Sequence, residues 1–349
     1  MLTLHLYDNK EVMHSLCIAI VKKKYMETMF WALELYDSGL IDPPSLITMW
    51  ILHFGFGPRC FSVLADILAI DSLDRDDFIK KIYSWCHMEK DSSVFHLLLK
   101  GLNSTIALSP EYKTLEKAME GYLMKGATVE AWLIATKLDT EVQWFILNKI
   151  AKAKKRVSQL DLLRGIENET LSIAAAFILV SISDESFKEA MLPYVVKSVL
   201  PKEITEAIND WDAEPSIRKR RLYKIKPEAL NLCERGTRLF TDSSLPELEG
   251  NFTDSLKASS CWQSILEDYL ENDAWKSDIY KEMFYNTYFP WTTDDIPDEW
   301  SLKDKEQSHG PGLGKTKQNA IIHYVTYMLN QSRFIPPFTI KTYPETLWG

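Results

Sequence analysis

Residues 309–316, HGPGLGKT, are close to a phosphate-binding loop in residue type and spacing. In the pattern G-x-x-x-x-G-K-[ST], backbone N–H groups and a lysine hold the phosphates of a nucleotide. Gly314, Lys315 and Thr316 fit this pattern, but His309 stands at the position of the first glycine. The chemistry that these residue types suggest is phosphate binding, and the flanking sequence decides whether it extends to ATP hydrolysis.

The flanking segments do not fit a nucleotide hydrolase. A phosphate-binding loop of that class lies between a buried β-strand and a helix, yet the preceding segment, DEWSLKDKEQS, is highly charged. Only 33 residues follow Thr316, which is too few for a parallel sheet. We therefore expect no ATPase site at 309–316, no catalytic residue there and no cofactor.

The helical half of the pattern is present, because a helix is predicted over 315–332. The start of a helix exposes backbone N–H groups that bind anions. Contact with phosphate or a nucleic-acid backbone is one interpretation of this turn, and a plain glycine turn before a helix is the other. The residues concerned are Gly312, Gly314, Lys315 and Lys317.

A second candidate for contact with nucleic acid is a basic cluster in SIRKRRLYKIK. Such a cluster suits neutralisation of phosphates or a nuclear-import signal. The alternatives are a solvated surface, or docking on the acidic segment 241–310, which has 16 acidic and 5 basic residues. We slightly favour docking because the whole chain has a net charge of −9. The basic residues are Arg218, Lys219, Arg220, Arg221, Lys224 and Lys226.

Two further charged groups are weaker candidates. The segment KIAKAKKR, 149–156, places basic residues at a helix end, where they are ordinary partners of the helix dipole. The pairs Asp294–Asp295 and Asp298–Glu299, near Trp291 and Trp300, could serve as acid–base carboxylates, but adjacent loop carboxylates are usually exposed. The five cysteines and seven histidines form no C-x-x-C and no H-x-x-x-H spacing, so we expect no metal site.

The elements that must position these residues are helices. Apolar residues recur at helical spacing and alternating strand patterns are nearly absent, which predicts an all-α irregular array of antiparallel helices without a regular repeat. Helices are predicted over 26–39, from a Ser109 cap with Pro110 to Gly126, over 257–271 and over 274–286. The apolar run 171–182 is too short to span a bilayer and predicts a buried helix.

The predicted organisation has three parts. Residues 1–210 form the helical array, 211–256 a basic, loop-rich connector, and 257–349 a helical segment with an acidic loop rich in Trp and Pro. The aromatic residues of the tail 333–349 predict that it packs back on the body, since aromatic residues resist disorder. No signal peptide is visible, and we expect an intracellular protein of the cytoplasm or nucleus that does not enter a membrane.

The stretch HSLCIAIVKKKYMETMFWALELYDSGL, 14–40, resembles the C-terminal helical, collar-like region of the MgsA/RarA-type AAA+ ATPases, relatives of clamp loaders. In that region a helix of small residues leads into an acidic–aromatic helix that ends in a glycine. The chain departs from the family at HFGFG, 53–57, where the family has an acidic turn. The segment 294–312 resembles uncharacterised helical proteins of large DNA viruses.

These resemblances imply a stand-alone relative of a clamp-loader helical domain without its ATPase module. We expect a non-enzymatic adaptor or scaffold in DNA replication or repair, of viral origin if the second resemblance holds, with protein partners and with DNA as a further partner class. Two alternatives stay open: a structural or assembly protein of a virus particle, and an enzyme with a carboxylate site in the loop 294–310. The sequence leaves the oligomeric state open.

Overall fold

The computed structural model describes residues 3–5, 7, 9–213, 223, 225, 256–257, 259–288 and 314–343, with the side chains of the last segment described from residue 322. In these residues helices are the predominant element, and the strands found are two of two residues each. The predicted all-α fold class is therefore confirmed.

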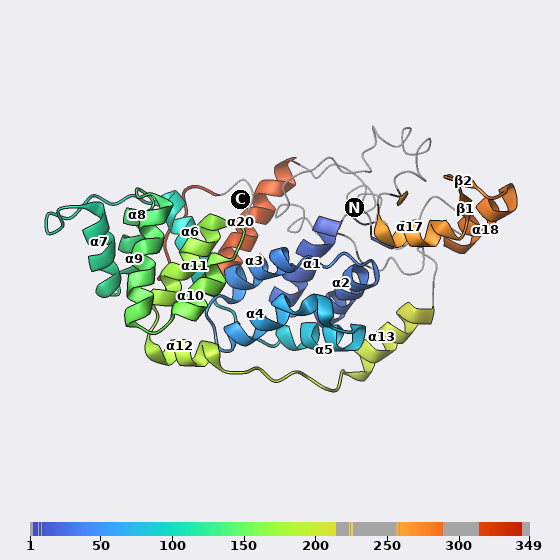
Figure 1. Cartoon of the computed structure of the whole chain (residues 1–349), viewed down its shortest axis with the longest axis horizontal. Coiled ribbons are helices and arrows are strands. Elements are labelled where there is room, and N and C mark those ends of the chain that lie inside the picture. The colour runs from blue at the N-terminus through green and yellow to red at the C-terminus, as the bar shows by residue number, and fades with distance from the viewer. Residues whose placement is uncertain are drawn as a thin grey trace.

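The helices fall into three groups along the chain (Figure 1). The first group is α1 (Asn9–Val21), α2 (Tyr25–Asp37), α3 (Pro43–Phe54), α4 (Cys60–Leu68), the short 3-10 helix Ile70–Ser72 and α5 (Arg75–Trp85). The second group is α6 (Ser93–Asn103), α7 (Leu115–Met124), α8 (Thr128–Ala135), α9 (Thr140–Ala153), α10 (Val157–Arg164), α11 (Glu169–Ser181) and α12 (Asp184–Met191). The remaining elements are α13 (Lys202–Ala213), α17 (Ser260–Glu267), β1 (Leu270–Glu271), β2 (Ala274–Trp275), α18 (Asp278–Tyr288) and α20 (Gly314–Leu329).

One hydrophobic core joins the first two groups of helices. Its buried side chains run from Tyr7 to Ile335, and α6 connects the groups by packing on α3 on one side and on α11 on the other. The predicted buried helix is α11, in which every residue from Leu171 to Val180 is buried. The side chain of Asn168 caps its start by accepting a hydrogen bond of 2.9 Å from Leu171 N.

A second, small hydrophobic cluster belongs to α17, the hairpin and α18. Leu256, Trp262, Leu266 and Phe284 form its buried centre. Figure 1 shows these elements at the end of the molecule opposite α7–α12. The segment 314–343 is next in sequence but packs on the main core, through Tyr324, Met328 and Ile335 among others.

The C-terminal tail packs on the body, as its aromatic residues predicted. Phe334, Ile335 and Phe338 lie against the main core. The side chain of Asn103, at the end of α6, accepts hydrogen bonds from the backbone N–H groups of Lys341 and Thr342, at 2.7 and 2.6 Å. The described part of the tail, up to residue 343, is thus held by both apolar and polar contacts.

Several predicted helix boundaries are wrong. The helix predicted over 274–286 begins only at Asp278, in α18, because Ala274–Trp275 form β2. Helix α7 does not begin at Ser109 but at Leu115, after the cap Thr114, because Tyr112 N bonds Ser109 O at 3.0 Å and closes a turn. The helix predicted over 257–271 ends at Glu267 in α17, and the chain then forms the hairpin β1–β2. Asn272 and Asp273 in its loop have φ of 47° and 65°, the left-handed geometry of a tight hairpin turn.

Candidate functional site

The candidate residues of the sequence lie almost entirely outside the residues that the structure describes. These are Arg218, Lys219, Arg220, Arg221, Lys224, Lys226, Gly312 and the carboxylates between 294 and 299. Gly314, Lys315 and Lys317 stand in the first turn of α20, of which only the backbone is described. The predicted helix after the glycine turn is confirmed, and the anion and nucleic-acid contacts stay predictions.

The described surface has a cleft of about 840 Å³ along the N-terminal half of α1. Its wall is built by four separate parts of the chain: α1, the start of α3 with the preceding turn, the end of α4, and the loop between α10 and α11. The lining residues are Asn9, Lys10, Met13, His14, Cys17, Leu40, Asp42, Pro43, Pro44, Ser45, Ile47, Thr48, Leu68, Gly165, Ile166, Glu167 and Asn168. We call this the α1 cleft.

The α1 cleft combines apolar and polar surface. Met13, Cys17 and Leu40 are buried in its wall, whereas the side chain of Leu68 is 56% exposed. Of the polar residues, Asp42 accepts a hydrogen bond of 2.5 Å from Ser45 at the start of α3. A cleft with apolar walls and a few polar groups is the usual form of a site for an apolar side chain or small ligand.

A second, shallower cleft of about 580 Å³ lies between α9 and the α10–α11 loop, and it shares Ile166 and Glu167 with the first. Phe145, on its edge, is 72% exposed. The guanidinium of Arg164 lies 5.6 Å from the ring centroid of Trp144, a distance typical of a cation–π contact. The two clefts are therefore neighbours that share the α10–α11 loop as a common wall.

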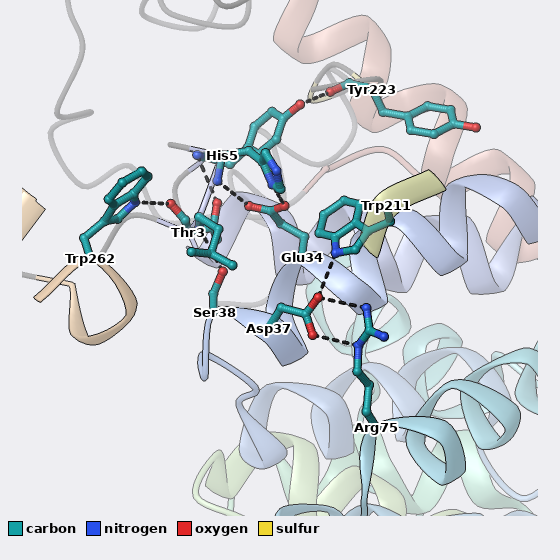
Figure 2. A network of polar contacts seen from close by, with 11 residues as sticks. Thr3, His5, Glu34, Asp37, Ser38, Arg75, Trp211, Tyr223 and Trp262 are labelled. Atoms are coloured by element: carbon teal, nitrogen blue, oxygen red, sulfur yellow. Dashed lines mark hydrogen bonds and ion pairs between the residues drawn. The ribbon is translucent and has the colours of Figure 1, made fainter. Parts of the chain in front are cut away.

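A buried polar network occupies the place where the N-terminal segment meets α2 (Figure 2). His5 N donates to Glu34 Oε1 at 3.0 Å, and His5 Nδ1 pairs with the other carboxylate oxygen. Burial acts to raise the pKa of Glu34, but the charge and hydrogen bonds of His5 outweigh it and hold that pKa below its ordinary value. Trp262, from α17, donates to Thr3 O at 2.9 Å.

The same network also anchors α13. Trp211 Nε1 donates to Asp37 Oδ2 at 2.7 Å, and Arg75 Nε donates to Asp37 Oδ1 at 2.8 Å (Figure 2). Arg75 also pairs with Asp212 at 2.8 Å. These charged groups are satisfied by one another, and they hold α13, α5 and α2 together.

Other buried titratable groups also hold the fold together. The hydroxyl of Tyr324, on α20, lies 2.7 Å from His53 Nε2. Burial lowers the pKa of His53 to about 3. Asp91 accepts hydrogen bonds from Phe56 N at 3.2 Å and Arg333 N at 3.1 Å, joining two distant loops. Burial raises the pKa of the Cys86 thiol to about 12, which makes it a poor nucleophile.

The basic segment 149–156 is also structural. Arg156 is fully buried and donates to the carbonyls of Leu179 and Ile182, at 2.6 and 3.0 Å. Lys154 Nζ donates to Val180 O at 2.5 Å. These cations bind the carbonyl end of α11, where the helix dipole favours positive charge, rather than the end of their own helix.

Among the residues that the structure describes, no group of three His, Cys, Asp or Glu side chains is placed to hold a metal ion. In the same part of the chain no single helix is long and apolar enough to cross a membrane, and the helix pair α11–α12, which reaches that length together, bends by 119°. Comparison of the chain with protein-family models, curated proteins and solved structures gives no match. The resemblance of residues 14–40 to the clamp-loader relatives thus stays a prediction.

The α1 cleft has no signal in the sequence. Its four wall segments are separated by up to about 150 residues, and each of them has an ordinary local role. Asp42 and Asn168 precede helices, and Pro43 and Pro44 occupy the first turn of α3. Only Leu68, an exposed leucine at a helix end, stands out once the fold is known.

Proposed function

We propose that the protein is a helical scaffold that binds a segment of a partner protein in the α1 cleft. The observation that supports this most is the cleft itself, an apolar-walled depression with polar edges on an all-α body. Helical bodies commonly bind partners through such grooves. Leu68, 56% exposed at the cleft, is the side chain that a bound partner would cover.

The setting that we propose is an adaptor in DNA replication or repair. This part of the proposal rests on the resemblance of residues 14–40 to the collar-like region of clamp-loader relatives. Residues of that stretch, among them Cys17 and Leu40, line the cleft. The proposed adaptor would therefore use the resembling region itself to contact its partner.

The test is affinity purification of the full chain from the cells in which it occurs, followed by identification of the bound proteins. Replication or repair proteins should be recovered with the wild type and lost with Leu68→Arg, because a charge in an apolar contact is costly. Leu102→Arg is the matched control, since Leu102 is equally exposed, at 59%, but lies on α6 outside the cleft. Recovery that is equal for both variants would contradict the role of the cleft.

An assembly protein of a larger particle is the second candidate. It is favoured by α18, whose Ile279 and Met283 are 67% and 52% exposed and lie one turn apart. Exposed apolar residues on one helix face are typical of contacts between subunits. Light scattering coupled to size exclusion separates the candidates: concentration-dependent multimers that Met283→Lys abolishes would favour assembly, and a monomer would count against it.

A further inference from the structure

Lysines from two distant segments gather around a tyrosine at the end of α1. Lys22, Lys23 and Lys24 follow directly after α1, and Lys90 lies in the loop between α5 and α6. The hydroxyl of Tyr327, on α20, accepts a hydrogen bond from Lys90 Nζ. The same hydroxyl donates to the carbonyl of the last residue of α1 at 3.2 Å. Two segments thus bring positive charge to the hydroxyl of Tyr327 on α20.

The ammonium groups of Lys90, Lys22 and Lys23 lie near enough to Tyr327 to interact with it. Lys90 Nζ lies 5.0 Å from the ring centroid of Tyr327. Burial raises the pKa of the Tyr327 hydroxyl, and the charges of Lys22 and Lys23 oppose that rise, so both ammonium groups act on this hydroxyl. The tyrosine is therefore the centre of a cationic surface.

Lys23, Lys24 and Lys90 differ from those cations of the described residues that pair with a carboxylate. Lys23, Lys24 and Lys90 form no ion pair with a carboxylate in the part of the chain that the structure describes. Arg75 and Lys81, in contrast, pair with Asp37 and Asp66. Lys90 is half-buried, and burial lowers its pKa. A partly desolvated ammonium group without a carboxylate is a cost to the fold that a bound anion would offset.

The helix dipole explains only part of this cluster. Lysines at the C-terminal end of α1 interact favourably with its free carbonyls, and this accounts for Lys22 and Lys23. It does not account for Lys90, which comes from another part of the chain and reaches the same place through Tyr327.

Aromatic residues are close to these lysines in the chain, since Tyr25 follows Lys24 and His87 precedes Lys90 by three positions. Tyr25, the first residue of α2, stacks on His87 with ring centroids 5.1 Å apart and an interplanar angle of 20°. Tyr83 meets His87 edge-on at 4.9 Å, and the His87 side chain is exposed. A cationic surface that follows a phosphate backbone, next to aromatic rings on which bases stack, is the usual form of a site for single-stranded nucleic acid.

We propose that Lys23, Lys24, Tyr25, His87 and Lys90 form a binding site for single-stranded nucleic acid. The lysines contact its phosphates, and the Tyr25–His87 pair supports a base. This site lies beyond the C-terminal end of α1, whereas the α1 cleft follows the N-terminal half of the same helix. The proposal is therefore independent of partner binding in the cleft, and one chain could hold both ligands at once.

The experiment is fluorescence anisotropy of a labelled oligothymidylate of about 20 nucleotides with the full chain, measured between about 0.05 and 0.2 M NaCl. The double variant Lys23→Glu with Lys24→Glu should weaken binding by at least ~10-fold and make the salt slope shallower by ~1.4, which corresponds to two single-strand phosphate contacts. Tyr25→Leu should weaken binding and leave the salt slope unchanged, because stacking releases no counterions.

The matched control is Lys113→Glu with Lys117→Glu. These lysines are also exposed, and the double variant changes the net charge by the same amount at the start of α7. Its dissociation constant should stay within ~2-fold, since charges beyond a Debye length are screened. Circular dichroism should show that all variants are folded.

Several outcomes would overturn the proposal. These are no binding of the oligonucleotide by the wild type at the lowest salt, equal losses in both double variants, and equal or tighter binding of a duplex. Binding to vesicles containing phosphatidylserine but not to the oligonucleotide would also overturn it and would make a lipid surface the ligand. Leu68→Arg should retain full oligonucleotide binding. The proposal for the α1 cleft and the proposal for this site can therefore be contradicted independently of each other.

Discussion

The indole of Trp262 donates a hydrogen bond of 2.9 Å to the backbone carbonyl of Thr3, 259 positions earlier in the chain. Trp262 is also the fully buried centre of the small cluster formed by α17 and α18. A single side chain thus stabilises this cluster and fastens it to the N-terminal segment. The N-terminal segment is in turn fixed to α2 by the pair of His5 and Glu34.

We expect Trp262→Phe to loosen the attachment of α17 and α18 more than it disturbs the main core. An aromatic ring is kept, although it is smaller than the indole, and the hydrogen bond to Thr3 is lost, at a cost of about 1 kcal/mol. Limited proteolysis should cut earlier between 256 and 288, while the far-ultraviolet circular dichroism spectrum stays helical. Trp262→Ala should cost about 3–5 kcal/mol of local stability through the cavity that it leaves. A proteolysis pattern equal to that of the wild type would contradict this role.

We expect Glu34→Gln to destabilise the protein by about 3–5 kcal/mol, because it breaks a buried pair and leaves His5 without its charged partner. The double variant His5→Leu with Glu34→Leu should lose less than the sum of the two single leucine variants. Chemical denaturation measures these free energies. Glu206→Gln, which removes an exposed i,i+4 pair with Lys202, is the control and should cost at most about 0.5 kcal/mol.

The pair also predicts a pH dependence. The pKa of Glu34 is lowered in the folded state, so its contribution to stability is present above the ordinary value of 4.5. That contribution is lost as the pH falls through the lowered pKa, where the carboxylate becomes protonated. Denaturation at successive pH values below 4.5 should therefore show that the free energy of unfolding falls more steeply with falling pH in the wild type than in Glu34→Gln.

Two buried histidines predict a further loss of stability, which begins at a higher pH than the loss due to Glu34. Burial lowers the pKa of His53 from 6.5 to about 3 and that of His96 from 6.5 to about 4. Between these values and 6.5 the unfolded chain binds protons that the folded chain does not. Each histidine therefore removes up to about 1.4 kcal/mol of stability per pH unit as the pH falls through this window. Asp91, whose pKa is raised by burial, opposes this fall below its raised pKa.

The test is the free energy of unfolding of the wild type and of His96→Leu between pH 7 and the acid transition. The slope in the variant should be about half that of the wild type above pH 4.5, because one of the two buried histidines is gone. An unchanged slope would mean that His96 takes up no proton on unfolding.

The sequence predicts helices well where the pattern is long and poorly where short segments offer two structures. Helix α11 is predicted because the apolar run 171–182 favours burial and helix alike. Ser109 and Pro110 fit a helix start and a turn equally, and the contact of Tyr112 with the α7 residue Gly121 selects the turn. The Asn272–Asp273 pair is a hairpin signal that the apolar spacing of 257–271 obscured.

The candidate sites depend on tertiary structure and could not be predicted in this way. The lysines at 22–24 read as an ordinary helix end until the fold brings Lys90 and Tyr327 beside them. The walls of the α1 cleft likewise come from segments that meet only through the packing of α1, α3 and the α10–α11 loop. Contacts of this range are decided by the whole core and not by local pattern.

For the loop at 309–316 we predict no ATP hydrolysis, whether it contacts phosphate or is a plain glycine turn before a helix. We expect from the sequence that Lys315 is exposed, so Lys315→Ala should leave the thermal midpoint unchanged within experimental error, because surface substitutions usually alter stability by less than about 0.5 kcal/mol. No ATP turnover should be measurable in either protein. Turnover in the wild type that Lys315→Ala abolishes would contradict the argument from the charged segment before the loop.

Arg156 should be among the most sensitive charged residues of the protein. Its side chain is fully buried and pairs with the exposed Asp184 at 2.7 Å and with the carbonyls at the end of α11, whereas its Nε has no hydrogen-bond partner among the described residues. Arg156→Met keeps most of the apolar stem but leaves Leu179 O without this donor, so we expect a loss of about 2–4 kcal/mol. Lys149→Met, on the preceding helix α9, removes the exposed pair with Glu120 and should cost at most about 1 kcal/mol. Urea denaturation of the two variants measures the difference, and equal losses would show that the buried contacts with α11 contribute no more than a surface ion pair.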